Sequence, residues 1–561
     1  MRTADAIVRT LKEEETEIVF GICGGYLFWL LRAFDEGGVR TIPSRHEGAA
    51  AFMAAAYAQA SGRIGVVFGQ GPGAINLLTG IASAYCDSTP MLAIAAQAPQ
   101  GGYAADVHQE ATGSNFGFDQ LAAFAPMVRE TFRCPSTVSA VRTLRRALAI
   151  AHGERGPVAI EFPANILGEE GSFEFLPPAR YRNEPRRVDV EGVEEAAKLI
   201  AGAARPAIII GNRASHRGLS DELRAMCEEA GLPFAVTDFA KGVIPEDHPL
   251  CLGVLGHSGH EGTHAYLESA DLVVTLGARL DSKTTVNHTA GLFSNLIQID
   301  DNAAEVGRNF PLRLGVIGDI PATVRALRAA LRTHQIDRPA TDWVAENRRK
   351  HRTYREPLAI EPPHEMGSAS VLSALRERLP RETLVVGDSG MNLHFLKRFF
   401  PVYAPDGFYC FYGFAAMGSG LPVSMGVQIA RPNEVVVSVI GDGGFLVYAG
   451  ELQIMAEYNI PVIVIVLNNA GYWQVGAYME KFIGSSYGCA IQEIDAAKIG
   501  QSFGCDGYTV RTLAELAAAV DQAVAKRRPA VIDVKVQGDK LEDVMLARSE
   551  QFVAKVYGRK S

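Results

Sequence analysis

Asp442 and Asn469 are the residues whose types and spacing most directly suggest chemistry in this 561-residue chain. Asp442 lies in the turn 441–444 (GDGG), directly after the apolar run 434–440, and Asn469 closes an Asn-Asn pair that follows the apolar run 461–467. Parallel strands joined by a helix place their carboxyl ends on one edge of a sheet. A carboxylate and an amide oxygen beside a phosphate suit Mg²⁺, so this spacing predicts a metal and phosphate site.

The glycines of the same turn favour an anion site. Gly441, Gly443 and Gly444 let backbone N–H groups approach a phosphate at the N-terminus of the helix expected over 445–458, where the helix dipole favours negative charge. The alternative is a tight turn with a capping Asp, followed by an unrelated Asn-Asn turn. The second apolar run, at the distance of one strand–helix–strand unit, favours the phosphate site.

The elements that must position these residues alternate regularly between short β-branched runs, glycine-rich turns and amphipathic helical stretches. The expected strands are 17–21, 64–69, 90–96, 206–211, 233–237, 271–276, 295–300, 383–387, 434–440, 461–467 and 530–536. Apolar strands that alternate with helices indicate parallel sheets covered on both faces. The predicted fold class is therefore α/β, with three doubly wound parallel-sheet domains.

Two stretches interrupt this alternation and are interpreted as linkers or surface-crossing segments. Residues 171–190 combine prolines and charges without a clear period, and residues 333–366 are highly charged and proline-rich at their end. Boundaries placed inside these stretches predict domains at 1–175, 190–335 and 366–561.

Composition restricts the class of protein. The chain is 48% hydrophobic and 21% charged, which is typical of a globular protein with a large core. Its net charge of −9 argues against a nucleic-acid partner, and no apolar run is long enough to span a bilayer. The amphipathic, acidic N-terminal stretch is unlike a signal peptide. The eight cysteines are scattered singly without a CxxC pair, which predicts reduced thiols in a cytoplasmic protein.

The segment that contains Asp442 and Asn469 resembles the signature of thiamine-diphosphate (ThDP) enzymes of the acetolactate synthase, benzoylformate decarboxylase and pyruvate decarboxylase group, in which GDG is followed by NN. The resemblance implies that Asp442, the Asn469 side chain and the backbone carbonyl of Gly471 ligate Mg²⁺. The diphosphate of ThDP would supply further oxygens.

Two segments upstream of the turn also resemble this family. Residues 415–422 (AAMGSGLP) resemble its MGxGLP segment, which implies that Met417 wedges beneath ThDP and that the backbone of Ala415 and Met417 binds the aminopyrimidine. Residues 388–392 (DSGMN) stand where the family has DVGQH, so Gly390 and Asn392 are expected to contact the diphosphate.

The first third of the chain carries the remaining family motifs, RHEGAA at 45–50 and GPGAINL at 71–77. In isolation, Glu47 would be interpreted as a helix N-terminal glutamate stabilised by the dipole. The resemblance instead implies that Glu47 is the catalytic carboxylate that shares a proton with the pyrimidine and that Asn76 contacts the cofactor. Gln109, within the HQE that replaces the family's FQE, is a second predicted catalytic residue. The expected domain order is pyrimidine-binding, middle and diphosphate-binding.

The middle third resembles the flavin-holding segments of acetolactate synthases at 244–249, 277–281 and 305–309, so FAD is a possible third cofactor beside ThDP and Mg²⁺. Three positions depart from that pattern. The GGG turn is replaced at 211–213 (GNR), Lys283 replaces an acceptor-binding Arg, and Tyr478 stands near the place of the Trp that selects 2-oxobutyrate.

The activity implied is that of an acetolactate synthase-like carboligase, which decarboxylates a 2-oxoacid such as pyruvate and joins the product to a second carbonyl compound. A non-ligating 2-oxoacid decarboxylase or C–C lyase of the same family is the first alternative, and a non-catalytic nucleotide-binding protein is the second. In the family, the counterparts of Glu47 and Asp442 come from different subunits. The resemblance therefore implies a homodimer or homotetramer with active sites at the subunit interface.

The paired-His signature of pyruvate decarboxylases is absent from the sequence. His257, His260 and His264 occur in and just after a Gly- and Ser-rich stretch of the middle third. They are expected to belong to a solvated or flavin-adjacent loop, and not to a catalytic or zinc site.

Overall fold

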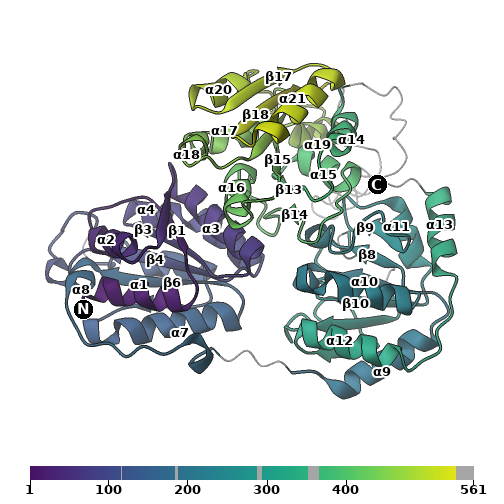
Figure 1. The fold of residues 1–561 in the computed structure, drawn as a ribbon, viewed down its shortest axis with the longest axis horizontal. Coiled ribbons are helices and arrows are strands. Elements are labelled where there is room, and N and C mark those ends of the chain that lie inside the picture. The colour runs from purple at the N-terminus through teal and green to yellow at the C-terminus, as the bar shows by residue number, and fades with distance from the viewer. Residues whose placement is uncertain are drawn as a thin grey trace.

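A computed structural model describes residues 1–114, 117–182, 187–215, 217–286, 288, 293–351 and 366–537. These residues form three six-stranded sheets, in each of which all neighbouring strands are parallel (Figure 1). This arrangement agrees with the predicted α/β class of three parallel-sheet domains. Each sheet takes its strands from one of the ranges 1–175, 190–335 and 366–561, and the bounds of the domains stay a prediction.

The first sheet has the order β2-β1-β3-β4-β6-β5. Its strands are β1 (Ile18–Gly21), β2 (Arg40–Pro43), β3 (Gly65–Gln70), β4 (Met91–Gln97), β5 (Thr131–Arg133) and β6 (Pro157–Pro163). The helices of this domain are α1 (Thr3–Glu13), α2 (Phe28–Glu36), α3 (Glu47–Ser61), α4 (Pro72–Asn76), α5 (Leu78–Cys86), α6 (Gln120–Phe124), α7 (Ala140–Gly153) and α8 (Ala164–Gly168).

The middle sheet has the order β12-β11-β10-β7-β8-β9, which is the strand order of dinucleotide-binding folds. Its strands are β7 (Pro206–Ile210), β8 (Phe234–Val236), β9 (Cys251–Val254), β10 (Leu272–Leu276), β11 (Leu296–Asp300) and β12 (Leu314–Ile317). Its helices are α9 (Val190–Gly202), α10 (Ser220–Glu229), α11 (Glu261–Glu268), α12 (Ile320–Leu331) and α13 (Ala340–Lys350).

The third sheet has the order β14-β13-β15-β16-β18-β17, the same topology as the first. Its strands are β13 (Leu384–Gly387), β14 (Phe408–Tyr409), β15 (Val436–Gly441), β16 (Ile463–Asn468), β17 (Asp506–Val510) and β18 (Ala530–Lys535). Its helices are α14 (Ser368–Arg378), α15 (Met391–Phe399), α16 (Gly420–Ala430), α17 (Asp442–Val447), α18 (Glu451–Glu457), α19 (Trp473–Ile483), α20 (Ala496–Ser502) and α21 (Leu513–Lys526).

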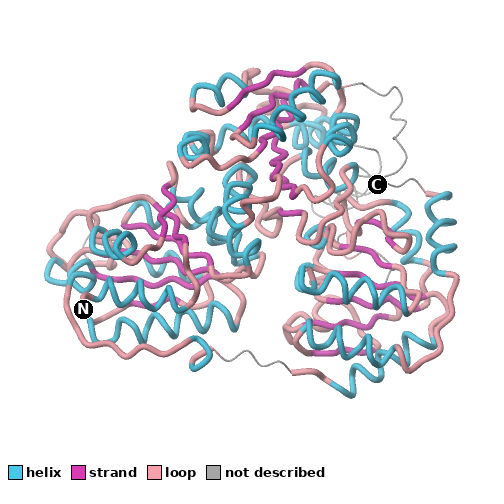
Figure 2. The backbone as a smooth tube through the Cα atoms, viewed as in Figure 1, coloured by secondary structure: helices cyan, strands magenta, loops and turns pink. Residues whose placement is uncertain are grey.

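The first and third domains meet through α3 and α16, which lie side by side (Figures 1 and 2). Nearly every residue of α3 is buried, because its run of alanines is covered on one side by its own sheet and on the other by α16. The backbones approach closely. A Cβ on Gly426 would lie only 2.3 Å from the carbonyl oxygen of Met53.

Two sequence-based expectations about elements are wrong. The single helix expected over 445–458 is two helices, α17 and α18, which are interrupted at Tyr448–Gly450. The stretch 333–366, predicted to be a linker, contains α13, whose Val344 is buried against the middle domain. In the part of the chain that the structure describes, no helix has the length and apolar character required to cross a membrane.

Candidate active site

The carboxyl edge of the third sheet holds the predicted metal ligands. The register pairs Gly441 with Leu467, so the two residues that follow, Asp442 and Asn468, lie on the same edge. The Asp442 side chain is only 1% exposed, and its two oxygens accept hydrogen bonds from the N–H groups of Gly443 (2.8 Å) and Gly471 (3.2 Å). Burial raises the pKa of Asp442, and these backbone N–H groups oppose that shift.

The two asparagines after β16 have different surroundings. Asn468 is buried and donates to Asp533 (2.9 Å), so it fixes the end of the strand. Asn469 is partly exposed, and its backbone carbonyl accepts from the Trp473 indole (2.7 Å). Asp442, Asn469 and Gly471 are therefore brought together, as the sequence predicted. One carboxylate, one amide oxygen and one backbone carbonyl form a donor set that fits Mg²⁺ completed by phosphate oxygens and water.

The predicted diphosphate loop begins with Gly390, whose φ of 137° favours glycine. The amide nitrogen of Asn392 donates to the backbone carbonyls of Asp388 (2.9 Å) and Val439 (3.2 Å). Asn392 thus joins the ends of β13 and β15, so its amide N–H groups hold the loop. Its amide oxygen faces Gly390 and Gly441.

Asp388, the first residue of the DSGMN segment, has a role that the sequence did not indicate. It accepts hydrogen bonds from the N–H groups of Gly418 (3.0 Å) and Gly420 (2.9 Å) and from the Ser419 hydroxyl (3.2 Å). Burial raises its pKa to about 6. Asp388 therefore anchors the segment that carries Met417 to the end of β13.

The segment predicted to bind the aminopyrimidine protrudes from this edge. Ala415 has a left-handed φ of 59°, and the Met417 side chain is exposed. A Cβ on Gly418 would lie 2.5 Å from Cβ of Val447 in α17, so the segment passes directly over the helix that starts at Asp442. The surrounding exposed apolar side chains are Phe414, Leu446, Val447, Tyr472 and Val475.

The predicted residues of the first domain gather around the turn after β3. Glu47 is the first residue of α3 and accepts a hydrogen bond from the Asn76 amide (2.9 Å). A Cβ on Gly73 would lie 2.5 Å from a Glu47 oxygen, and a Cβ on Gly71 would lie 3.1 Å from Cβ of Gln109. The glycines of this turn thus make room for Glu47 and Gln109 on either side.

Glu451 of the third domain positions the start of α3, a role that no local pattern indicated. Its side chain is 1% exposed, and one oxygen accepts from the N–H groups of both Arg45 and His46 (2.9 Å each). Burial raises the pKa of Glu451 to about 7, and the neighbouring Glu47 carboxylate adds to the shift. The His46 ring also packs edge-on against Tyr448, with ring centroids 5.5 Å apart.

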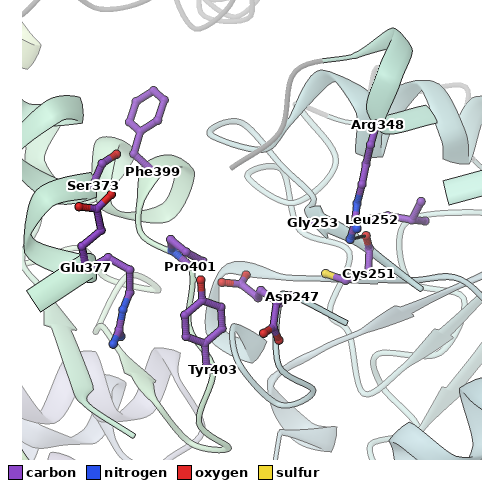
Figure 3. A pocket seen from close by; sticks show the side chains of 12 residues that line it. Asp247, Cys251, Leu252, Gly253, Arg348, Ser373, Glu377, Phe399, Pro401 and Tyr403 are labelled. Atoms are coloured by element: carbon purple, nitrogen blue, oxygen red, sulfur yellow. Dashed lines mark hydrogen bonds between the residues drawn. The ribbon is translucent and has the colours of Figure 1, made fainter. Parts of the chain in front are cut away.

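The two groups of predicted residues come from different domains: Glu47, Asn76 and Gln109 lie in the first, whereas Asp442 with residues 469–471 (the predicted metal loop) and residues 412–417 (the Met417 segment) lie in the third. Within the described residues, no hydrogen bond or ion pair joins Glu47, Asn76 or Gln109 to the residues of the metal loop or the Met417 segment. None of the described residues that line the two main cavities belongs to either group. The smaller cavity, about 180 Å³, lies between the middle and third domains (Figure 3). In that view Cys251 and Arg348 lie on one side of it and Ser373 and Glu377 on the other.

The larger cavity, about 1180 Å³, lies where the three domains meet and reaches the carboxyl edge of the middle sheet. Arg213, which replaces a glycine of the family's GGG turn, is 5% exposed and forms ion pairs with Asp300 (3.6 Å) and Asp301. Five further arginines line the cavity, namely Arg63, Arg129, Arg155, Arg182 and Arg187. The lining is thus rich in groups that bind phosphate.

The other two positions that depart from the family pattern are Lys283, which contacts the third domain, and Tyr478, which contacts its own helix. Lys283 donates to the carbonyl of Tyr412 (2.8 Å) and lies 3.6 Å from the centre of its ring. Tyr478 stacks on Phe482 in α19, with ring centroids 6.4 Å apart. Lys283 is therefore a bridge between domains.

The expectation that the middle-domain histidines belong to a solvated or flavin-adjacent loop is wrong for His260. Its ring is buried and is hydrogen bonded to the N–H of Val254 (3.3 Å) and to the carbonyl of Arg398 (3.1 Å) in the third domain. The flanking glycines and serines gave the stretch a loop-like composition, but the third domain covers it.

Comparisons with known proteins agree with this geometry. Models of thiamine pyrophosphate enzymes, whose cofactor is ThDP, match residues 1–122 (N-terminal TPP binding domain), 193–327 (central domain) and 388–534 (C-terminal TPP binding domain). A probable acetolactate synthase large subunit of Methanocaldococcus jannaschii is 31% identical over 96% of this chain and 92% of its own length. An acetolactate synthase of Mycobacterium bovis is 31% identical (96% and 88%), and an acetolactate synthase large subunit of Lactococcus lactis is 30% identical (85% and 82%).

Proposed function

Because the chain belongs to the thiamine pyrophosphate enzyme family and is an acetolactate synthase-like enzyme, we propose that it is a ThDP- and Mg²⁺-dependent carboligase that acts on a 2-oxoacid such as pyruvate. The reaction would release CO₂ and form a carbon–carbon bond to a second carbonyl compound. The observation that carries the proposal is the convergence of Asp442, Asn469 and Gly471 at one sheet edge, beside the exposed Met417 segment.

The metal loop and the diphosphate loop would hold the cofactor. Asp442, the Asn469 side chain and the Gly471 carbonyl would ligate Mg²⁺, and the N–H groups near Gly390 and Gly443 would face the phosphates. The backbone of Ala415 and Met417 would bind the aminopyrimidine. Bound ThDP supplies a carbon nucleophile and an electron sink for decarboxylation.

Glu47 would hold the proton that is shared with the pyrimidine nitrogen. The Asn76 amide donates to Glu47 and so fixes the direction of its carboxylate. Glu451 accepts from the N–H groups of Arg45 and His46 and so fixes the backbone just before Glu47. Gln109, directed by Gln70 (2.8 Å), would face the substrate side of the same turn.

We propose a homodimer or homotetramer in which Glu47 of one chain faces the metal loop of another. The origin of the two groups in different domains, with no hydrogen bond between them among the described residues, and the exposed apolar side chains around Met417 support this arrangement. Mixing the inactive variants Glu47→Gln and Asp442→Ala tests it, because a mixed dimer would contain one intact site. We expect activity to recover on mixing. If the mixture stays inactive although mass spectrometry detects mixed dimers, the site is formed within one chain.

A nucleotide would fit the large cavity at the middle sheet. Its arginine lining and its place at the carboxyl edge of a dinucleotide-type sheet support FAD or ADP as the occupant. Protein purified with flavin should stay yellow after gel filtration. A colourless protein that binds neither added FAD nor added ADP would leave the middle domain with a scaffolding role.

Product analysis distinguishes the carboligase from the alternatives. With pyruvate we expect acetolactate, or an acyloin when an aldehyde is added, and a screen of 2-oxoacids with products identified by mass is the decisive measurement. Free aldehyde as the sole product would place the enzyme among the decarboxylases. Lys283 and Tyr478 should give an acceptor preference different from that of biosynthetic acetolactate synthases.

We also propose a cytoplasmic location, which the eight free cysteines support.

A further inference from the structure

A hydrogen bond between Asp87 and Gly413 is one of the contacts between the first and third domains. Asp87 directly follows α5, and one of its carboxylate oxygens accepts a hydrogen bond from the N–H of Gly413 (3.1 Å). A Cβ on Gly413 would lie 2.2 Å from that oxygen and 2.9 Å from Cβ of Cys86. A side chain at position 413 would therefore force the two segments apart.

The middle domain joins the same point through two cationic side chains. Arg279 donates to the carbonyl of Cys86, and Lys283 donates to the carbonyl of Tyr412 (2.8 Å). Each cation thus holds the residue just before Asp87 or Gly413. All three domains are bonded to one another within a few residues, and we call this contact the three-domain junction.

The segment that leaves the junction is the one that the proposed function assigns to the aminopyrimidine. Gly413 is followed by exposed Phe414, by Ala415 in a left-handed conformation and by exposed Met417. At its other end Asp388 holds Gly418 and Gly420. Between these two anchors the segment has large exposed side chains, so the anchors determine where it lies.

We infer that Asp87 is a positioning residue for the cofactor: through Gly413 it sets the place of segment 412–417 and thereby the affinity for ThDP. The inference rests on the proposed function, because it takes ThDP as the ligand of that segment. It assigns a role to a residue that lies in the first domain and does not touch the cofactor.

The second oxygen of Asp87 makes the junction responsive to pH. Asp87 is 8% exposed, lines the large cavity, and has no hydrogen-bond partner for this oxygen among the described residues. Burial raises its pKa to about 7, while the Gly413 N–H, Arg279 and Lys283 oppose the shift and Asp281 adds to it. The thiols of Cys86 and Cys410 are the other titratable groups nearby. Because burial makes the folded chain hold the Asp87 proton more tightly than the unfolded chain does, the contribution of Asp87 to the junction weakens as the pH rises through about 7.

The test measures the dissociation constant of ThDP with saturating Mg²⁺ at pH 6 and pH 8 by calorimetry. We expect the wild type to bind ThDP more tightly at pH 6, where Asp87 keeps its proton. Asp87→Asn keeps the shape of the side chain and an acceptor oxygen but does not titrate. The ThDP affinity of this variant should therefore not show the difference between pH 6 and pH 8 that Asp87 causes in the wild type. Asp87→Ala leaves the Gly413 N–H without its acceptor, and its affinity should be lower by about tenfold at both pH values. The turnover number at saturating ThDP should change much less.

Asp406→Asn is the matched control. Asp406 lines the same cavity, and burial raises its pKa to about 7 as well, but Asp406 lies outside the contact between Asp87 and Gly413. The control should keep the wild-type difference in ThDP affinity between pH 6 and pH 8.

If Asp87→Ala does not fold, the isosteric Asp87→Asn is sufficient for the test. Wild-type ThDP affinity and pH dependence in Asp87→Asn would refute the inference while leaving the proposed function intact. Failure of the wild type to bind ThDP would refute both.

Discussion

The first and third domains have sheets of the same strand order, and in each the turn after the third strand lies in the predicted site. In the third domain this turn follows β15 and supplies a side chain, because Asp442 accepts the N–H of Gly443 in its own turn and the N–H of Gly471 in the neighbouring loop. In the first domain the turn follows β3 and supplies space. Gly71 and Gly73 leave room for Gln109 and Glu47, which come from other segments.

The difference between these turns matches the two functions proposed for them, metal binding in the third domain and proton exchange in the first. A metal ion needs ligands in a constant geometry, and adjacent strands of one sheet provide it through the backbone register. A carboxylate that exchanges a proton needs a face open to its ligand, so Glu47 is held by Asn76 and, through the backbone before it, by Glu451. The metal loop is thus fixed locally, whereas the position of Glu47 depends on another domain.

Removal of the metal ligand should have the largest effect. Asp442→Ala should abolish Mg²⁺-dependent ThDP binding, because Asp442 is the one charged protein ligand of the predicted site. Calorimetry with and without a chelator measures this. Asp521→Ala, which removes an exposed carboxylate of α21, is the control and should bind normally. Unchanged ThDP affinity in Asp442→Ala would refute the metal assignment.

Glu47→Gln should affect the other turn without affecting cofactor binding. Glutamine keeps the size of the side chain but cannot share the proton, so ThDP should bind while the reaction slows by about 10²–10⁴-fold, the range for a general acid–base group. Hydrogen–deuterium exchange at C2 of the thiazolium, followed by NMR, reports this step directly. Glu195→Gln on the surface of α9 is the control. Equal exchange rates in Glu47→Gln and wild type would contradict the assigned role.

Glu451→Gln should change how stability depends on pH. The folded state holds the Glu451 proton more tightly than the unfolded chain does, because burial raises its pKa from 4.5 to about 7. The wild type should therefore lose stability from this group as the pH rises between these values, by up to about 3 kcal/mol. Urea unfolding at pH 5 and pH 8 should show a smaller loss in Glu451→Gln. An identical loss in both proteins would show that Glu451 does not titrate in this range.

Asn76→Ala should have the smallest effect. It removes one partly exposed hydrogen bond to Glu47, which corresponds to a loss in turnover of about three- to tenfold. ThDP affinity should also fall slightly if Asn76 contacts the cofactor. Steady-state kinetics at saturating ThDP separates the two effects. Wild-type turnover would mean that Glu451 alone determines the position of Glu47.

The predicted residues that the structure places on one sheet edge are those whose partners are near in sequence or one strand away. Asp442 and Asn469 were placed on one edge because apolar runs and glycine turns identify parallel strands. Asp87, Asp388 and Glu451 could not be assigned in this way. Asp388 lies in the DSGMN segment, but the burial of all three carboxyl groups results from distant segments whose contacts leave no local pattern.

Secondary structure was missed for similar physical reasons. β6 has proline at both ends and was not expected to be a strand, although every residue of it is buried. β14 is only two residues long, which is too short to give a periodic signal. The break between α17 and α18 begins at Tyr448, whose ring packs against His46 of the first domain. Single-sequence periodicity does not include such a contact.

The contact between Glu451 and the backbone of Arg45 and His46 determines when the first domain can be completed during synthesis. The sheet of that domain ends at Pro163, yet the start of α3 and the face of α3 that its own sheet leaves uncovered are contacted by residues of α16 and α18, from position 420 onward. At about 5–20 residues per second, a ribosome needs roughly 20–80 s to extend the chain from Arg45 to Glu451. During that interval the emerging first domain exposes the apolar face of α3, so we expect the nascent chain to engage chaperones at this face.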